Sequence, residues 1–219
     1  MAPSWAFRSW TSAFGRACGV LLDTIVRWLA LSRINPNVLT FMGLVVNTWA
    51  AILFGSATAL TQQRLFFYAG LVIIGSGFFD LVDGAVARAT NRVTRFGAFF
   101  DSVVDRYSDA SQFLGLLVFY ARGDRFFYVV LTAFVMVSAI MVSYTRARAE
   151  SLIGSCRVGF MERPERLVLV IIGALFNRMA PVLWIIAVLS TLTVIHRMRY
   201  TWTRTQDAPP VAAKAGHAA

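Results

Sequence analysis

Long hydrophobic stretches, separated by short polar linkers, make up most of this chain. An α-helix needs ~20 apolar residues to cross a bilayer, and most of the stretches approach that length, although the fifth is shorter. The six stretches lie at about residues 38–60, 65–88, 96–120, 126–146, 165–178 and 181–199. The pattern predicts an all-α integral membrane protein, a bundle of six transmembrane helices.

The two ends of the chain differ from this pattern. Residues 20–33, VLLDTIVRWLALSR, combine Asp23, Arg27 and Arg33 with a wide apolar face, which predicts a juxtamembrane amphipathic helix in the membrane interface. The C-terminal TQDAPPVAAKAGHAA has the composition of a disordered tail. We therefore expect an N-terminal segment at 1–34, a six-helix domain at 35–203 and a disordered cytoplasmic tail at 204–219.

Composition supports a membrane protein. Hydrophobic residues make up 58% of the chain and charged residues 15%, with a mean hydropathy of +0.63. Soluble domains are nearer one half apolar and one quarter charged. Too few charged residues are present to cover a water-soluble core of this size.

The positive charges indicate the orientation. Lys and Arg number 21 against 11 Asp and Glu, and most of these cations flank the stretches on the side that holds both termini. The positive-inside rule then places both termini in the cytoplasm, in a multi-pass protein of the cell membrane in contact with membrane lipids. No polar helix carries a basic stripe with interleaved aromatics, so we expect no nucleic-acid partner.

Four carboxylates interrupt the second and third stretches. Asp80 and Asp83 are three residues apart, and Asp101 and Asp105 are four apart, so each pair shares a helix face. The linker between the two stretches is cytoplasmic by the charge pattern, so both pairs lie near one membrane surface. Acids facing lipid cost roughly 2.5–3.5 kcal/mol each, whereas carboxylate oxygens suit hard divalent cations. The pattern predicts a site for Mg²⁺ or Mn²⁺.

Neutralisation of these acids by arginines such as Arg88 and Arg106 is the alternative. The small residues beside the acids favour a ligand site instead. Gly84 and Ala87 leave room after Asp83, and Arg88 can reach a phosphate. Gly97 clears space one turn before the second pair of acids.

The whole string resembles the signature of the CDP-alcohol phosphotransferase family. Eight positions match over 26 residues: Asp80, Asp83, Gly84, Ala87, Arg88, Gly97, Asp101 and Asp105. The resemblance implies that Asp80, Asp83 and Asp101 bind a pair of divalent metal ions. Asp105 would be both a ligand and the catalytic base that deprotonates an acceptor alcohol.

The resemblance also implies the substrate that carries the transferred group. CDP-diacylglycerol would give up its phosphatidyl group to the alcohol and release CMP, and the enzyme would be a homodimer. Pro36, Asn37 and Thr40 resemble the start of the family's first transmembrane helix, near the nucleotide. The expected CDP-lipid site comprises these three residues with Gly84, Ala87, Arg88 and Gly97.

Arginines gather in two later segments, SYTRARAE at 143–150 and GFMERPERLVL at 159–169. A cluster of guanidinium groups is suited to bind a phosphate dianion through paired hydrogen bonds. Contact with lipid headgroups is the simpler alternative. The cluster comprises Arg146, Arg148, Arg163 and Arg166, and Arg197 at the end of the last stretch can join it.

These segments are similar to those of bacterial phosphatidylinositol phosphate synthases. The resemblance implies that inositol 1-phosphate is the acceptor and that Arg146, Arg166 and Arg197 hold its phosphate, with Arg148 nearby. In that group a lysine usually stands where this chain has Arg146, which keeps the charge and alters the geometry.

Three alternatives stay open. Glycerol 3-phosphate could be the acceptor in the same chemistry, as in a phosphatidylglycerophosphate synthase. An archaetidyl donor presents the same CDP head as a diacyl donor. A divalent-cation transporter is a more remote alternative, because its acids would line a path across the membrane, whereas these four gather near one surface.

Overall fold

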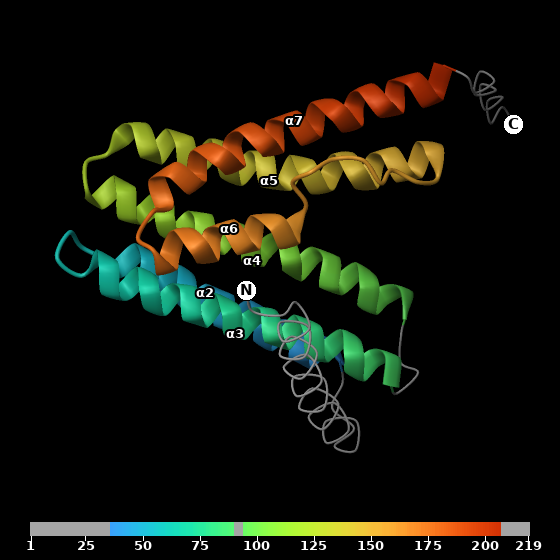
Figure 1. Cartoon of the computed structure of the whole chain (residues 1–219). Helices are drawn as coiled ribbons and strands as arrows, with labels where there is room; N and C mark the ends of the chain where they lie inside the picture. The colour runs from blue at the N-terminus through green and yellow to red at the C-terminus, as the bar shows by residue number, and fades with distance from the viewer. Residues whose placement is uncertain (1–35, 90–93, 207–219) are drawn as a thin grey trace, which may run out of the picture.

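The computed structural model describes residues 36–89 and 94–206, which are helical apart from short connections (Figure 1). This part contains six helices and no strand: α2 (Pro36–Ser56), α3 (Gln62–Ala89), α4 (Arg95–Arg122), α5 (Phe126–Ile153), α6 (Arg163–Leu175) and α7 (Met179–Gln206). The all-α prediction is confirmed. The N-terminal segment predicted at 1–34, with its interfacial helix at 20–33, falls outside the described residues.

Two helices extend further than the sequence pattern predicted. α5 continues to Ile153, so Arg146 and Arg148 lie on its last turns and not in a linker. α7 continues to Gln206, so residues 204–206, the start of the expected disordered tail, are helical. In both cases the polar end of a helix continues the apolar part that hydropathy detects.

Three of the described helices are long and apolar enough to cross a membrane, namely α2, α5 and α7. α3 and α4 are as long as α5, at 28 residues, but include acids and arginines. α6 has 13 residues, which is about 20 Å of helix against a hydrocarbon core of about 30 Å. These features identify a membrane protein, and they do not confirm the count of six spans.

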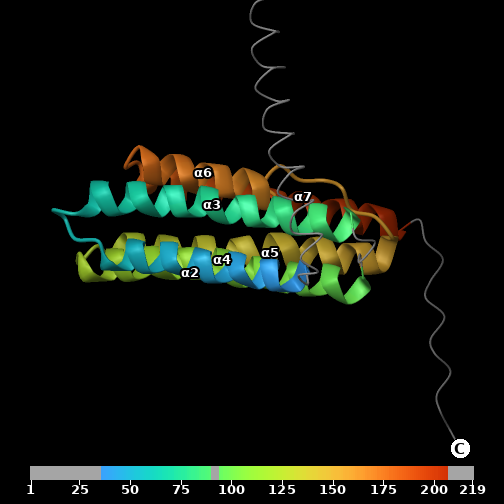
Figure 2. The same cartoon turned by 90° about the horizontal axis from the view of Figure 1, so that it is seen from below.

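The helices pack in a closed ring. α2 contacts α3 and α4, α5 contacts α4 and α7, and α6 contacts α3 and α7. Figure 2 shows α3 and α6 on one side of the bundle, with α2, α4 and α5 on the other. Successive helices alternate in direction, so α3, α5 and α7 end on the side of the bundle where α2 and α4 begin (Figure 1).

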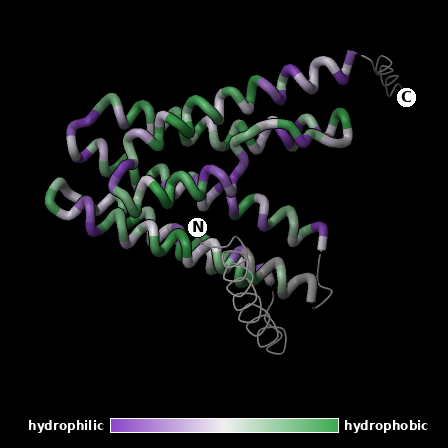
Figure 3. Tube along the Cα trace, in the orientation of Figure 1, coloured by the Kyte–Doolittle hydropathy of each residue, from purple (hydrophilic) through white to green (hydrophobic). Residues whose placement is uncertain are grey.

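α6 begins part of the way along the bundle, whereas the other helices begin at one of its ends. The segment 154–162 runs back along α5 before α6 starts. The first residues of α6 therefore lie part of the way along the bundle and not at the end where α5 stops (Figure 1). Hydrophilic residues mark this start among the hydrophobic stretches of the surrounding helices (Figure 3). The backward turn brings charged side chains to the depth of the α3 and α4 carboxylates.

Aromatic side chains pack together at the end of the bundle away from the carboxylates. Phe66 of α3 lies between Phe54 of α2 and Phe119 of α4, with ring centroids 5.0 and 4.9 Å away. Both contacts are edge-to-face, the arrangement that aromatic pairs prefer. This cluster fixes α2, α3 and α4 against one another far from the carboxylates.

A buried polar network joins the same three helices nearer to the carboxylates. The Asn47 amide of α2 donates to Ser76 Oγ of α3, and Gln112 Nε2 of α4 donates to Asn47 Oδ1 at 2.6 Å. Ser76 Oγ in turn donates to the Gly43 carbonyl at 3.1 Å. Ser76 lies one turn before Asp80, so the network holds that part of α3 in register with α2 and α4.

α2 and α4 approach most closely at Gly115. A Cβ atom at this position would lie 2.2 Å from the Ala51 carbonyl oxygen, so the two backbones are in direct contact. Only a residue without a side chain permits this approach.

Gly115→Ala is expected to lower the free energy of unfolding by about 1–3 kcal/mol, because the added methyl group forces α2 and α4 apart. Thermal unfolding in detergent measures the effect. Gly75→Ala is the matched control, because a Cβ there meets no atom within 4 Å. Equal unfolding temperatures for the two variants would contradict the close approach of α2 and α4.

Candidate active site

Carboxylates from α3 and α4 form the first half of the site. Asp80 lies near the end of α3, and Asp101, Asp105 and Asp109 follow one another at successive turns of α4. Gly43 of α2 lies behind Asp80, where a Cβ atom would come within 3.1 Å of Asp80 Oδ1. The missing side chain leaves room for the Asp80 carboxylate between the helices.

Arg163, the first residue of α6, connects two of these acids. Its Nη1 atom lies 2.9 Å from Asp80 Oδ2 and 2.8 Å from Asp105 Oδ1. One guanidinium nitrogen therefore touches carboxylates from two different helices. Asp101 lies within electrostatic range of both Asp80 and Arg163. The structure thus brings together Asp80, Asp101 and Asp105, which the sequence predicted to converge.

Asp109 has a partner of its own. It accepts a hydrogen bond from Nη2 of Arg166, whose side chain is 3% exposed. The Nε and Nη1 atoms of Arg166 have no hydrogen-bond partner among the described residues. Buried donors are nearly always paired in proteins, so these two nitrogen atoms are available to an anion.

The acids fit a hard divalent cation. Their oxygens come from two helices and already share one positively charged group, Arg163, as the oxygens of a carboxylate metal site share an ion. Asp109 is paired mainly with Arg166 and lies further from Arg163, with its Oδ1 atom 3.7 Å from Arg163 Nε. Among the described residues, no three Asp, Glu, His or Cys side chains are already arranged to hold a metal ion, and the Arg163 guanidinium lies between Asp80 and Asp105.

Asp83, the fourth predicted metal ligand, lies three residues after Asp80 on α3. Asp83 and the expected CDP-lipid residues Gly84, Ala87 and Arg88 continue that helix to its end at Ala89. Their side chains lie outside the part that the structure describes, so their assigned roles stay predictions.

The starts of α2 and α4 bring together the other residues expected at the CDP-lipid site. A Cβ atom at Gly97 would lie 3.5 Å from Asn37 Oδ1 and 3.0 Å from Thr94 Oγ1. Thr40 is buried one turn after Asn37, and Pro36 is the first residue of α2, a position that suits proline. Gly97 therefore keeps a narrow space open beside Asn37.

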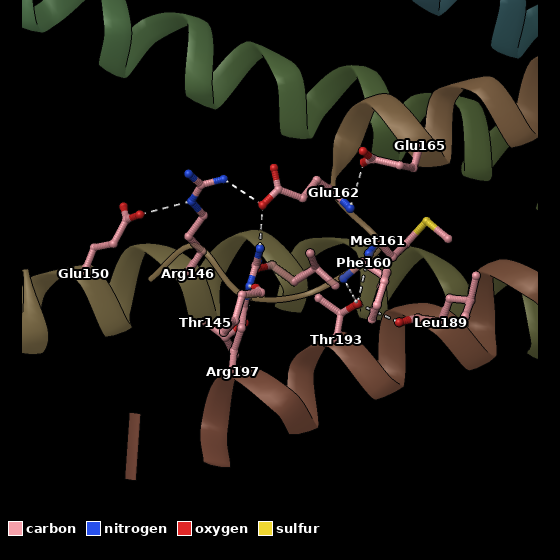
Figure 4. Close-up of polar contacts among 12 residues, drawn as sticks. Thr145, Arg146, Glu150, Phe160, Met161, Glu162, Glu165, Leu189, Thr193 and Arg197 are labelled. Atoms are coloured by element: carbon pink, nitrogen blue, oxygen red, sulfur yellow. Dashed lines mark hydrogen bonds and ion pairs between the residues drawn. The ribbon is translucent and has the colours of Figure 1, made fainter. Parts of the chain in front are cut away.

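The second half of the site centres on Glu162, the residue before α6 (Figure 4). Its Oε1 atom accepts hydrogen bonds from Arg146 Nη1 of α5 and Arg197 Nη2 of α7, both at 2.9 Å. Arg146 Nε also donates to Glu150 Oε1 at 3.1 Å. Two of the arginines expected to hold a phosphate thus meet at one carboxylate.

The backbone before Glu162 is fixed to α7. Thr193 Oγ1 accepts from the Phe160 and Met161 amides at 3.3 and 3.0 Å (Figure 4). Gly159 turns the chain with a φ of 115°, a conformation that favours glycine. These contacts place the Glu162 side chain between α5 and α7.

A cavity of about 120 Å³ joins the two halves. The acids of α4, the arginines of α5 and α7, and the start of α6 all contribute to its wall. The charged lining residues are Asp105, Arg106, Asp109, Arg146, Glu162, Arg163 and Arg197. An acceptor in this cavity would have a carboxylate on one side and two guanidinium groups on the other.

The other two predicted phosphate-binding arginines do not line this cavity. Arg148 points to Ser151 Oγ, 3.5 Å away, and lines a separate cavity of about 320 Å³ between α5 and α7, beside Tyr144 and Trp202. Arg166 is buried on Asp109 behind the cavity wall. Of the four arginines, Arg146 and Arg197 share the cavity beside the acids, and Arg148 and Arg197 share the separate cavity.

Sequence reasoning missed the central position of Glu162 and the contacts of Arg163 with the acids. The segment MERPER alternates acidic and basic residues, and only its arginines were given a role. The position of Glu162 between Arg146 and Arg166 in the sequence was the available signal for its role. The backward turn before α6, which sends Glu162 and Arg163 to opposite halves of the site, has no comparable sequence pattern.

Comparison with known proteins identifies the family. Residues 33–196 match the sequence profile of the CDP-alcohol phosphatidyltransferases. The chain is 37% identical over 179 residues to the archaetidylinositol phosphate synthase of Pyrococcus horikoshii, covering 81% of this chain and 88% of that protein. It is 36% identical over 205 residues to the phosphatidylinositol phosphate synthase of Mycobacterium tuberculosis, covering 88% of each.

Solved structures show the same fold. The crystal structure of the Mycobacterium tuberculosis phosphatidylinositol phosphate synthase with CDP-DAG bound superposes with a TM-score of 0.77 and 31% identity, covering 88% of this chain and 98% of that chain. A structure of that enzyme in complex with manganese and citrate gives a TM-score of 0.73 at 31% identity, covering 87% and 93%. On the sequence match, the fold and the two-sided site, this chain belongs to the CDP-alcohol phosphatidyltransferase family.

Proposed function

We propose that this enzyme transfers the phosphatidyl group of CDP-diacylglycerol, or the corresponding archaetidyl group, to inositol 1-phosphate and releases CMP. The observation that carries the proposal is the single cavity that holds Asp105 on one side and the paired Arg146 and Arg197 on the other. A phosphorylated alcohol needs such an arrangement, with its phosphate on the guanidinium groups and its hydroxyl toward an acid. Relatives named for inositol phosphate support this acceptor.

Asp105 is the proposed base. The acceptor hydroxyl gives its proton to the Asp105 carboxylate, and its oxygen forms a bond to the lipid-bearing phosphorus. The bond from that phosphorus to the bridging oxygen breaks, and CMP leaves with that oxygen. Arg163 Nη1 lies 2.8 Å from Asp105 Oδ1 and must release that oxygen before it can accept a proton.

Asp80, Asp83, Asp101 and Asp105 are the proposed ligands of divalent metal, two ions of Mg²⁺ or Mn²⁺. When bound, such ions neutralise the pyrophosphate of the donor and stabilise the phosphate that departs. The manganese complex of the mycobacterial enzyme supports this choice of metal. By holding the ions, the acids would fix where the donor's pyrophosphate lies relative to the cavity.

The donor headgroup is proposed to lie between the starts of α2 and α4 and the end of α3. Pro36, Asn37, Thr40 and Gly97 provide the first part of this site, and Gly84, Ala87 and Arg88 the second. Arg166 would donate from its unpaired Nε and Nη1 atoms to the acceptor's phosphate, and Arg148 would approach the phosphate from α5.

The proposal includes a topology. α3 and α4 cross the membrane beside α2, with their acids at the cytoplasmic surface, and the short α6 completes the ring as the fifth of six spans. Both termini and the active site then face the cytoplasm of a cell-membrane protein. A homodimer is the proposed assembly.

An acceptor panel tests the function. The purified protein in phosphatidylcholine nanodiscs, with CDP-diacylglycerol and either Mg²⁺ or Mn²⁺, is offered inositol 1-phosphate, glycerol 3-phosphate, myo-inositol or serine. We expect CMP release with inositol 1-phosphate to exceed that with each other acceptor, and a chelator to stop it. Equal or faster release with glycerol 3-phosphate would replace the proposed acceptor. Comparing the rate of CMP release from a CDP-archaetidyl donor with that from CDP-diacylglycerol at the same concentration shows which lipid the enzyme prefers.

A further inference from the structure

Two successive side chains at the start of α6 fill the two halves of the site with charges of opposite sign. The Glu162 carboxylate lies on the arginines, and the Arg163 guanidinium lies on the acids. A substrate complex would place the same signs in the same places, because a phosphate is negative and a metal ion is positive. The protein's own residues therefore balance the charges of the site.

Arg197 is the reason that an internal anion is needed. Its side chain is 1% exposed, and its Nε and Nη1 atoms donate to the carbonyls of Val158 and Val142. The third nitrogen, Nη2, donates to Glu162 Oε1 at 2.9 Å. A buried guanidinium without a counter-ion is strongly destabilising, so Glu162 neutralises Arg197 when the cavity holds no other anion.

Glu162, which also belongs to the capping box of α6, contacts both arginines through a single oxygen atom. Its Oε1 accepts from both Arg146 and Arg197. The phosphate of an acceptor offers three oxygens and two negative charges, and it can bond to each guanidinium separately. Such an anion can displace the carboxylate, whereas an uncharged alcohol offers nothing that replaces it.

We propose that Glu162 is an internal competitor of the acceptor's phosphate, displaced from Arg146 and Arg197 when a phosphorylated acceptor binds. This inference rests on the proposed function and adds a specificity-determining residue to it. Glu162 lowers the affinity for every anion that must displace it, and a dianion offsets this cost better than a singly charged ligand, because it can replace the contacts with both arginines. An unphosphorylated alcohol cannot displace the Glu162 carboxylate from the two arginines, so the site discriminates against it.

The test is direct binding of inorganic phosphate and of inositol 1-phosphate to Glu162→Gln, by calorimetry in phosphatidylcholine nanodiscs without CDP-lipid. The amide keeps the size of the side chain and removes its charge. We expect both anions to bind about tenfold more tightly than to the unaltered protein, since one charged hydrogen-bonding competitor is lost. Zwitterionic lipid excludes an anionic headgroup as the ligand, and adding phosphatidylglycerol to the disc shows whether one competes.

Glu150→Gln is the matched control, because Glu150 contacts Arg146 and not Arg197. Like Glu162→Gln, it removes one carboxylate charge from beside Arg146. We expect it to change the phosphate affinity less than Glu162→Gln does. Glu162→Asp keeps the charge on a shorter side chain and should bind phosphate with intermediate affinity. This variant also tests the inference if Glu162→Gln does not fold.

A weaker affinity of Glu162→Gln for phosphate would overturn the inference, because it would show that Glu162 positions the arginines for the ligand. An equal gain in Glu150→Gln would overturn it too, since general charge would then explain the effect. Neither binding result depends on turnover. Failure of the acceptor panel with the unaltered protein would therefore count against the proposed function and leave this measurement interpretable.

Discussion

Asp105→Asn is expected to lower kcat about 10³-fold, because the amide cannot accept the proton of the acceptor hydroxyl. Asp105 lines the cavity that holds the paired arginines, so it is the acid of the cluster best placed to face an acceptor. Asn keeps the size of the side chain, and Arg163 still has Asp80 as a partner. Binding of CDP-diacylglycerol, measured separately from turnover, should therefore persist.

Asp124→Asn is the matched control for this substitution. Asp124 lies in the turn between α4 and α5, at the opposite end of α4, and its φ of 53° is a conformation that Asn also tolerates. It should leave CMP release unchanged. If Asp105→Asn retained more than about a tenth of the original kcat, the loss would be too small for a general base.

Arg166→Met is expected to lower the free energy of unfolding by about 3 kcal/mol, because it removes the nearer counter-ion of the buried Asp109 carboxylate and leaves only Arg163 Nε, 3.7 Å away. The side chains of Arg166 and Asp109 are 3% and 11% exposed, so water cannot replace the lost partner. For a chain of this length the unfolding temperature should fall by about 10 °C. Differential scanning fluorimetry in detergent measures it.

The double variant Arg166→Met with Asp109→Leu separates stability from binding. Replacing both members of a buried ion pair by apolar side chains is often close to neutral, so most of the lost unfolding temperature should return. The KM for inositol 1-phosphate should stay raised in the double variant if Arg166 also binds the phosphate. No recovery of stability would contradict the assignment of Arg166 as the main partner of Asp109.

Hydrophobic length predicted the number and order of the helices, and it was least accurate where their polar ends begin. α5 and α7 continue past their apolar parts because backbone hydrogen bonding does not depend on side-chain polarity. The network of Asn47, Ser76 and Gln112 carries no sequence signal either, because three separate polar residues within apolar stretches do not specify one another.

The acids were the most predictable part of the site. Helical spacing places each pair on one face, and the short linker makes the two helices neighbours of opposite direction, so the convergence of Asp80 with Asp105 follows from the sequence. The arginines were less predictable. Which guanidinium faces the cavity depends on the turn at Gly159 and its contacts with Thr193, and these separate Arg146 and Arg197 from Arg166.

The roles of the acids depend on metal binding between α3 and α4. The most direct measurement is an anomalous difference map from crystals grown with Mn²⁺ and CDP-diacylglycerol. We predict peaks bounded by Asp80, Asp83, Asp101 and Asp105, with Arg163 no longer bridging Asp80 and Asp105. Manganese bound elsewhere, with the Arg163 guanidinium still between the two carboxylates, would contradict the account.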